Sequence, residues 1–177
     1  MLPILLALAF IAILFIVVIA GQPDEFTVSR SAKMAAPPER VFPHVNDLHR
    51  WEAWSPWAKM DPNAKNSFAG PAAGVGAAMK WEGNCKVGVG RMTITESRPG
   101  KLIRFRLDFE KPMKATNLAE FTFRPEGGQT FVTWSMSGTN SFAGKIFGLF
   151  MNCEAMIGGP FEKGLASLKS VAEAATP

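Results

Sequence analysis

Five side chains in the loops and short helices of this 177-residue chain could take part in proton transfer: His44, His49, Glu52, Asp61 and Glu96. General acid–base catalysis needs such a group within hydrogen-bonding reach of the substrate. If these side chains faced one interior surface, the protein could be an enzyme that uses them as general acids or bases. The two histidines are five residues apart and have no further ligand at metal-binding spacing, so we expect no metal and no cofactor.

Other catalytic motifs are absent from the sequence, which contains no GxSxG, no HExxH and no phosphate-binding loop. The stretch 70-GPAAGVG-76 lacks a following Lys-Ser/Thr pair and predicts a turn. The basic residues are scattered rather than clustered, so no nucleic-acid partner is indicated. Cys85 and Cys153 form no CxxC motif, and we expect two free, buried thiols, with a single disulfide as the alternative. We therefore name no catalytic residue.

The stretch 51-WEAWSPWAKMDP-62 holds three of the five tryptophans, Trp51, Trp54 and Trp57. A short helix over 47–54 would end at Pro56, because the residue before a proline avoids the helical region. We expect the three indoles mainly to pack the end of a core. The alternatives are that they line a ligand mouth or touch lipid headgroups.

Most of the remaining chain predicts β-strands. In 26-FTVSRSAKM-34, apolar and polar residues alternate, which is typical of a strand with one buried face. Further strands are expected over 67–69, 77–82, 87–97, 102–109, 118–124 and 130–137. Short turns rich in Gly and Pro separate them, which favours an antiparallel meander.

Two regions predict helices that would cover this sheet. Pro38 suits the first turn of a short helix, which Pro43 would limit. Near the C-terminus an apolar stripe recurs at steps of three and four residues: Ile157, Phe161, Leu165, Leu168 and Ala172. Because Gly158-Gly159-Pro160 interrupts the stripe, we expect a break or kink there and a helix onward to about Ala174.

The alternation gives the predicted sheet one wet face and one apolar face, which the C-terminal helix would cover. We expect no charged side chain in mid-strand on the apolar face, and the one exception on that face would be Glu96 at a strand end. Gly88 and Gly90 would face inward and leave room for a cavity, unless they merely let the sheet bend. The residues predicted to line this cavity are Trp54, Trp57, Met79, Trp81, Gly88, Gly90, Met92, Phe105, Phe109, Phe121, Trp134, Met136, Ile157, Phe161 and Leu165.

The N-terminal segment Leu2–Ala20 carries no charged side chain and would span about 28 Å as a helix, close to the thickness of a bilayer core. We expect a single-pass membrane anchor over 1–21, with a cleaved signal peptide as the alternative. A short linker, 22–25, would keep the following domain, 26–175, against the membrane. The basic residues after the segment favour a cytoplasmic domain.

Several stretches resemble the START-like superfamily of polyketide cyclases/dehydrases and lipid-transport proteins (SRPBCC), in particular its small bacterial members. They are FTVSRSAKM, APPERVFPHVNDLHRWEAWSPW, MDPNAK, GVGAAMKWEGN, VGVGRMTITES and GPFEKGLASLK, and together they cover nearly all of 25–174. The resemblance implies an α+β helix-grip fold, in which a seven-stranded antiparallel sheet wraps a long C-terminal helix around an apolar cavity. Members bind lipids, sterols, polyketides or other hydrophobic ligands, and some are enzymes.

Three functions follow as hypotheses. The first is membrane-tethered binding or transport of a hydrophobic, lipid-like molecule in the cavity between sheet and helix. The second is the cyclase- or dehydratase-type enzyme. The third is a non-catalytic protein-interaction domain with a closed core and an exposed apolar patch, although the sequence names no protein partner.

Overall fold

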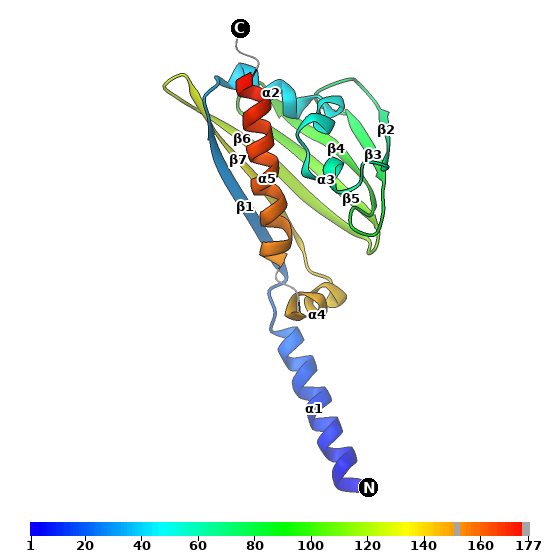
Figure 1. Ribbon diagram of the computed structural model, residues 1–177. Helices are drawn as coiled ribbons and strands as arrows, with labels where there is room; N and C mark the ends of the chain where they lie inside the picture. Colours follow the sequence, from blue (N-terminus) through cyan, green and yellow to red (C-terminus); the bar gives the residue numbers. More distant parts are fainter. Residues whose placement is uncertain (151–152, 175–177) are drawn as a thin grey trace.

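A seven-stranded antiparallel sheet curves around a long C-terminal helix in the computed structural model, which describes residues 1–150 and 153–174 (Figure 1). The strands follow the order β1-β7-β6-β5-β4-β3-β2, so β2 to β7 form a meander and β1 returns beside β7. This arrangement confirms the expected α+β helix-grip fold.

The strands begin and end close to the predicted positions. Their bounds are β1 (Glu25–Met34), β2 (Lys65–Ala69), β3 (Ala78–Glu82), β4 (Val89–Arg98), β5 (Leu102–Lys111), β6 (Ala115–Glu126) and β7 (Gln129–Thr139). The largest difference is at β6, which begins at Ala115 rather than at 118. It pairs there with the end of β5, where Phe109 lies opposite Ala115.

The helices are α1 (Leu2–Ala20), α2 (Pro38–Asn46), the 3-10 helix η1 (Leu48–Ala53), α3 (Pro56–Met60), α4 (Phe142–Phe150) and α5 (Cys153–Ala174). The three proline predictions had different outcomes, and the prediction that Pro43 limits the first helix was wrong. Pro43 lies inside α2, which continues because Asp47 N–H donates to the Pro43 carbonyl at 3.2 Å. The helix before Pro56 ends at Ala53, as predicted, and Pro56 itself begins α3, where its missing N–H leaves no bond unmade. The break expected at Pro160 does not occur, because Pro160 lies inside a continuous α5 whose buried stripe outweighs one lost hydrogen bond.

A cluster of aromatic rings joins α5 to the concave face of the sheet. The indole of Trp134 on β7 stacks on Phe161 of α5, with ring centroids 4.0 Å apart, and on Phe121 of β6 at 4.7 Å. Trp51 and Trp54 lie against this stack with their own rings 4.6 Å apart. Both are buried, which confirms that these two indoles pack the core.

The N–H groups of these two indoles connect the core to α2. Trp51 Nε1 donates to the Val45 carbonyl and Trp54 Nε1 donates to the His44 carbonyl, both at 2.9 Å. A buried indole therefore keeps its hydrogen bond while its ring supplies apolar area. The third tryptophan, Trp57 of α3, is half-buried against Trp134.

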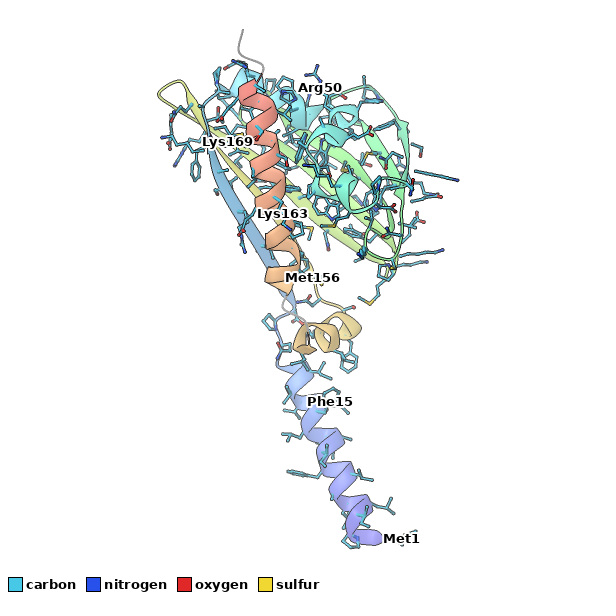
Figure 2. The ribbon with its side chains drawn as sticks, in the orientation of Figure 1. Met1, Phe15, Arg50, Met156, Lys163 and Lys169 are labelled. Carbon is cyan, nitrogen blue, oxygen red and sulfur yellow. The ribbon has the colours of Figure 1, made fainter. Side chains whose placement is uncertain are left out.

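Helix α1 projects from the domain, and the N-terminus lies at the opposite end of the molecule from the C-terminus (Figure 1). Among the residues that the structure describes, α1 is the one helix long and apolar enough to cross a membrane. Its side chains, including the labelled Phe15, point away from the axis on several sides without covering one another (Figure 2).

His44 lies on α2 beside, rather than within, the buried stripe that contains Val41, Phe42 and Val45. Partial burial lowers the pKa of its imidazole from 6.5, and the positive charges of Arg50 and Arg40 act in the same direction. The folded domain therefore favours the neutral imidazole.

We predict that Trp54→Ala lowers the free energy of unfolding by about 3–5 kcal/mol, because it removes a fully buried indole and leaves a cavity. Urea unfolding followed by circular dichroism measures the change. Trp57→Ala is the matched control and should have a smaller effect, since that indole is half-buried. Equal losses in the two variants would contradict a central role for Trp54 in packing.

We also predict that stability falls as the pH drops below about 6.5, because the unfolded chain then binds a proton at His44 that the folded domain binds only at lower pH. The stability is fully present above that pH and is lost as the pH approaches the lowered pKa. His44→Asn should reduce this decline, measured as the urea midpoint against pH. An unchanged decline in the variant would show that other groups cause it.

Candidate functional site

The inner face of the sheet has two unlike ends. Near α2 it is filled by the buried cluster around Trp134. Nearer α1, one cross-strand row runs through Phe26, Gly138, Asn117, Leu107, Met92 and Met79. The next row towards that end contains Trp81, Gly90 and Phe109. We call the half-buried apolar side chains at this end the proximal apolar surface: Phe26, Met79, Trp81, Leu107, Phe109 and Ile157.

The residues predicted to line a cavity lie along this inner face and on the elements that cover it, apart from Gly88. Eight are buried in the core: Trp54, Met92, Phe105, Phe121, Trp134, Met136, Phe161 and Leu165. Five are half-buried: Trp57, Met79, Trp81, Phe109 and Ile157. The half-buried members are the ones whose apolar atoms a further molecule could still cover.

The two glycines do not leave the room that their expected positions suggested. Gly88 lies in the turn before β4 with φ of 71°, and a Cβ there would meet the Lys111 carbonyl oxygen at 2.4 Å. Gly90 does face inward, but its Cβ would lie 2.5 Å from a carbon of the Trp81 indole. The indole therefore occupies the space above Gly90, and T-shaped packing of Trp81 on Phe109 continues the apolar surface.

Asn117 places an amide on the inner face that sequence reasoning missed. Its residue is 8% exposed, and the one side-chain hydrogen bond it makes to a described residue is a long contact from Nδ2 to the Met136 sulfur, at 4.0 Å. The amide lies over Gly138, where a Cβ would meet Oδ1. Asn117 comes just before the predicted start of its strand, but extending the alternation by one residue would have found it.

A second under-used polar group is the N–H of Trp134. Within the described part of the chain, Trp134 Nε1 is a buried side-chain atom that has no hydrogen-bond partner. Leaving a buried donor unpaired costs about 1–3 kcal/mol. This N–H lies in the filled end of the inner face, so the Asn117 amide is the one of the two that borders the half-buried end.

Arg30 corrects the expectation of an inner face without charge. It follows the alternation of Phe26 and Val28 on β1, and its Nε donates to a carboxylate oxygen of Glu162 on α5 at 2.6 Å. Gly158 makes room for it, because a Cβ there would lie 2.2 Å from a guanidinium nitrogen. Arg30 therefore belongs to the seam between β1 and α5, where it helps to hold the helix.

The candidate proton-transfer residues do not gather on the inner face. Glu96 was expected to face inward, but a bulge between Ile94 and Glu96 reverses the alternation. Its carboxylate forms ion pairs with Arg98 and Arg104 on the outer face. Glu52 is exposed, and His44 lies beside the buried stripe of α2.

Asp61 and His49 have local structural roles. Asp61 accepts backbone N–H groups from Asn84 at 2.7 Å and Asn63 at 3.2 Å, so it joins the chain after α3 to the turn after β3. The His49 ring lies 3.1 Å from the Asp47 carboxylate, measured from Nδ1 to Oδ1, and stacks on Phe68 with ring centroids 4.0 Å apart.

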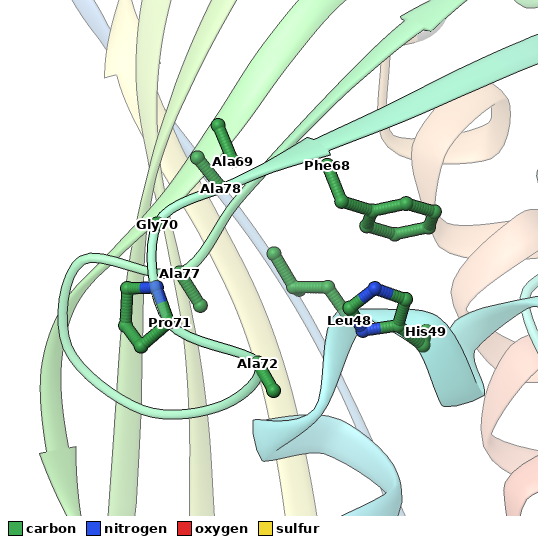
Figure 3. A pocket seen from close by; sticks show the side chains of 9 residues that line it. All are labelled: Leu48, His49, Phe68, Ala69, Gly70, Pro71, Ala72, Ala77 and Ala78. Carbon is green, nitrogen blue, oxygen red and sulfur yellow. The ribbon is translucent and has the colours of Figure 1, made fainter.

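His49 and Phe68 border a pocket of about 290 Å³ between η1, β2 and the loop after β2 (Figure 3). Its lining also includes Leu48, Pro71 and Ala72, and the rings of His49 and Phe68 face one another at its edge. None of the predicted cavity residues lines it. This pocket lies outside the inner face, so a substitution in it can serve as a control for substitutions on the inner face.

The described residues contain no group of three or more His, Cys, Asp or Glu side chains placed to hold a metal ion. Cys85 is free but exposed, which corrects the prediction of a buried thiol, because it lies in the turn between β3 and β4. The side chain of Cys153 is outside the described part of the chain.

Comparisons with known structures support the architecture. Protein CV1439 from Chromobacterium violaceum is 17% identical with a TM-score of 0.60, covering 86% of this chain and 99% of that chain. The Aha1 dimer from Colwellia psychrerythraea is 19% identical with a TM-score of 0.61, covering 86% and 99%. The di-domain ARO/CYC protein BexL is 13% identical with a TM-score of 0.61, covering 92% of this chain and 54% of its own. At these identities the likeness shows the fold alone.

The sequence itself identifies the family. No curated protein matches the chain. The model of a family described as polyketide cyclase / dehydrase and lipid transport, however, matches residues 25–173, from the first residue of β1 to the last turn of α5. Because this match spans most of the chain and confirms the resemblance seen in its motifs, the protein belongs to the polyketide cyclase/dehydrase and lipid transport family.

Proposed function

We propose that this protein binds a hydrophobic, lipid-like small molecule on the proximal apolar surface while α1 holds the domain at a membrane. The observation that carries the proposal is the pairing of these two features. Half-buried aromatic and methionine side chains lie at the end of the sheet from which an apolar helix of 19 residues extends. The family's description, which includes lipid transport, agrees with this function.

Apolar burial would supply most of the affinity. Covering apolar surface contributes about 25 cal/mol per Å², before the cost of ordering the ligand and side chains. Met79 and its neighbour Trp81 are only half-buried, and a flexible thioether adapts to an irregular apolar shape. The Asn117 amide would then bind one polar group of the ligand, as the few polar groups of an apolar site usually do.

The proposal of a membrane anchor is based on α1. Its 19 residues would span about 28 Å, and no charged side chain interrupts them. All of its described side chains are exposed except that of Ile19, so the helix does not serve as part of the domain core. Residues 1–21 thus form the anchor, and the ligand-binding domain begins at β1.

The enzyme alternative lacks comparable support, because the candidate acid–base residues do not gather beside the apolar surface. Asp61 and Glu96 are used in local contacts, and Glu52 is exposed. No specific observation on the inner face favours proton transfer from these groups.

Ligand binding predicts opposite effects of Asn117→Leu on stability and on affinity. Removing a buried, poorly bonded amide should raise the free energy of unfolding by about 1 kcal/mol, while losing one hydrogen bond to the ligand should weaken binding about fivefold. Native mass spectrometry of the gently extracted full chain would detect the retained lipid, and lipid titration would give the affinity.

Phe68→Ala at the separate pocket is the matched control and should leave lipid affinity unchanged. A chain that neither retains nor accepts any lipid would contradict the proposal. Loss of binding in Phe68→Ala but not in Asn117→Leu would move the ligand to the other pocket.

The anchor makes a separate prediction about processing. Intact-mass measurement of the protein from the membrane fraction should find a chain that retains residues 1–21, because the apolar segment is longer than the usual hydrophobic region of a cleaved signal peptide. A mature protein that begins after Ala20 would instead identify the segment as a cleaved signal peptide.

A further inference from the structure

Helix α4 is attached to the place where α1 leaves the domain. It contacts α1, and Ile19, near the end of α1, is 1% exposed. Just before α4, Asn140 N–H donates to the Asp24 carbonyl at 2.7 Å, and Asn140 Nδ2 donates to the Pro23 carbonyl at 3.1 Å. The Lys145 ammonium lies 2.5 Å from the Asp24 carboxylate. These contacts fix α4 at the level of the last turn of α1.

The sequence of α4, 142-FAGKIFGLF-150, is unusual for a helix that meets water. Lys145 is its one charged residue, and the ion pair with Asp24 neutralises it. Phe142 is nevertheless 57% exposed, and Met156 at the beginning of α5 is 48% exposed. Figure 2 shows Met156 beside α4, at the junction between the domain and α1. Apolar side chains are thus exposed together at the level where the anchor ends.

The depth of this level follows from the anchor. If α1 spans a bilayer, its end at Ala20 lies near the boundary between acyl chains and headgroups. Helix α4 touches the last turn of α1 and must lie near the same boundary. A short apolar helix with few charges is stable there, because its exposed face is covered by lipid rather than water.

The tip of the β5–β6 hairpin lies at the same end of the domain. Beyond the row that joins Leu107 to Asn117, the two strands continue to Lys111 and Ala115, past the beginning of β1. Met113 at the tip is 45% exposed and is flanked by exposed Lys114. An apolar side chain between lysines suits contact with anionic headgroups. Figure 1 shows this end of the sheet and α4 on the same side of the domain.

We propose that α4 lies in the headgroup–acyl boundary of the bilayer that α1 spans, so that the proximal apolar surface faces this bilayer and receives its ligand directly from it. The ligand is then a membrane amphiphile rather than a molecule captured from water. Phe26 and Ile157, which are half-buried and pack against the edge of the buried core, are the first protein side chains that it contacts. This inference rests on the proposed function and adds the source of the ligand and its route.

The position of α4 is tested by depth-dependent quenching on the full chain. A background with Cys85→Ser and Cys153→Ser carries a single cysteine, Phe142→Cys, labelled with the environment-sensitive NBD fluorophore. The protein is placed in vesicles of phosphatidylcholine and phosphatidylglycerol that contain nitroxide-labelled lipid. The NBD emission should shift to the blue and be quenched.

Lys101→Cys in the turn between β4 and β5, at the far end of the sheet, is the matched control and should stay unquenched. Met113→Cys supplies a second label at the proximal end and should be quenched by nitroxide in the headgroup region. Water-like emission without quenching at both Phe142→Cys and Met113→Cys would overturn the placement of α4.

The route is tested by loading. Phe142→Asp puts a charge on the apolar face of α4 without removing a core side chain. Uptake of a pyrene-labelled phospholipid from the same vesicles should slow about tenfold or more, whereas uptake from detergent micelles should be unchanged. If the unsubstituted chain and Phe142→Asp took up lipid from vesicles at equal rates, the direct route would be overturned.

The failure of this inference is distinguishable from the failure of the proposed function. A chain that loads lipid from micelles but has an unquenched Phe142 label keeps the function and overturns the inference. A chain with a quenched label that loads no lipid from either source supports the placement of α4 and contradicts the function.

Discussion

The stacking of Trp134 between Phe161 and Phe121 is the interaction on which the rest of the structure depends. It joins α5 to the middle of the sheet, with ring centroids 4.0 and 4.7 Å apart, and buries all three rings. Offset and stacked aromatic pairs contribute about 0.5–1.5 kcal/mol beyond the area they bury. Once α5 is held there, its apolar stripe follows the concave face along β1, and the Arg30–Glu162 ion pair closes the seam.

This placement explains why the inner face has one filled end and one half-covered end. Trp51 and Trp54 add two more indoles near α2, and their N–H groups are satisfied by backbone carbonyls. At the other end of the sheet, Phe26, Leu107 and Phe109 stay half-buried, although Trp81 packs on Phe109. The polar groups of the inner face follow the same division, because the Asn117 amide lies in the half-covered end and makes only a long contact to sulfur. A filled core and a half-covered apolar surface thus share one sheet.

Alternation predicted the strands well, since a buried face imposes a period of two on any strand that it contains. It failed where one extra residue entered the ladder. The bulge before Glu96 changes the face of that carboxylate, and nothing in the local pattern of 87–97 marks it. The prediction of an uncharged inner face was wrong for the opposite reason. Arg30 obeys the alternation, which places it on that face, but the prediction did not take its position into account. The prediction of a break at Pro160 failed because local propensity is weaker than the burial that a continuous α5 secures for Phe161, Leu165 and Leu168.

By itself, the sequence determined the family, the meander of strands, the apolar anchor-like segment and the apolar character of the inner face. These features depend on local periodicity and composition, which act over a few neighbouring residues. Only the tertiary structure decided that Trp81 fills the space above Gly90, that Asn117 meets Met136, and that α4 returns to the end of α1 through Asp24 and Lys145. Each of these contacts joins residues from different elements, and their geometry depends on how the sheet curves and where α5 crosses it. Periodicity therefore predicts which side chains are buried, but the packing of distant segments decides which of them remain available to a ligand.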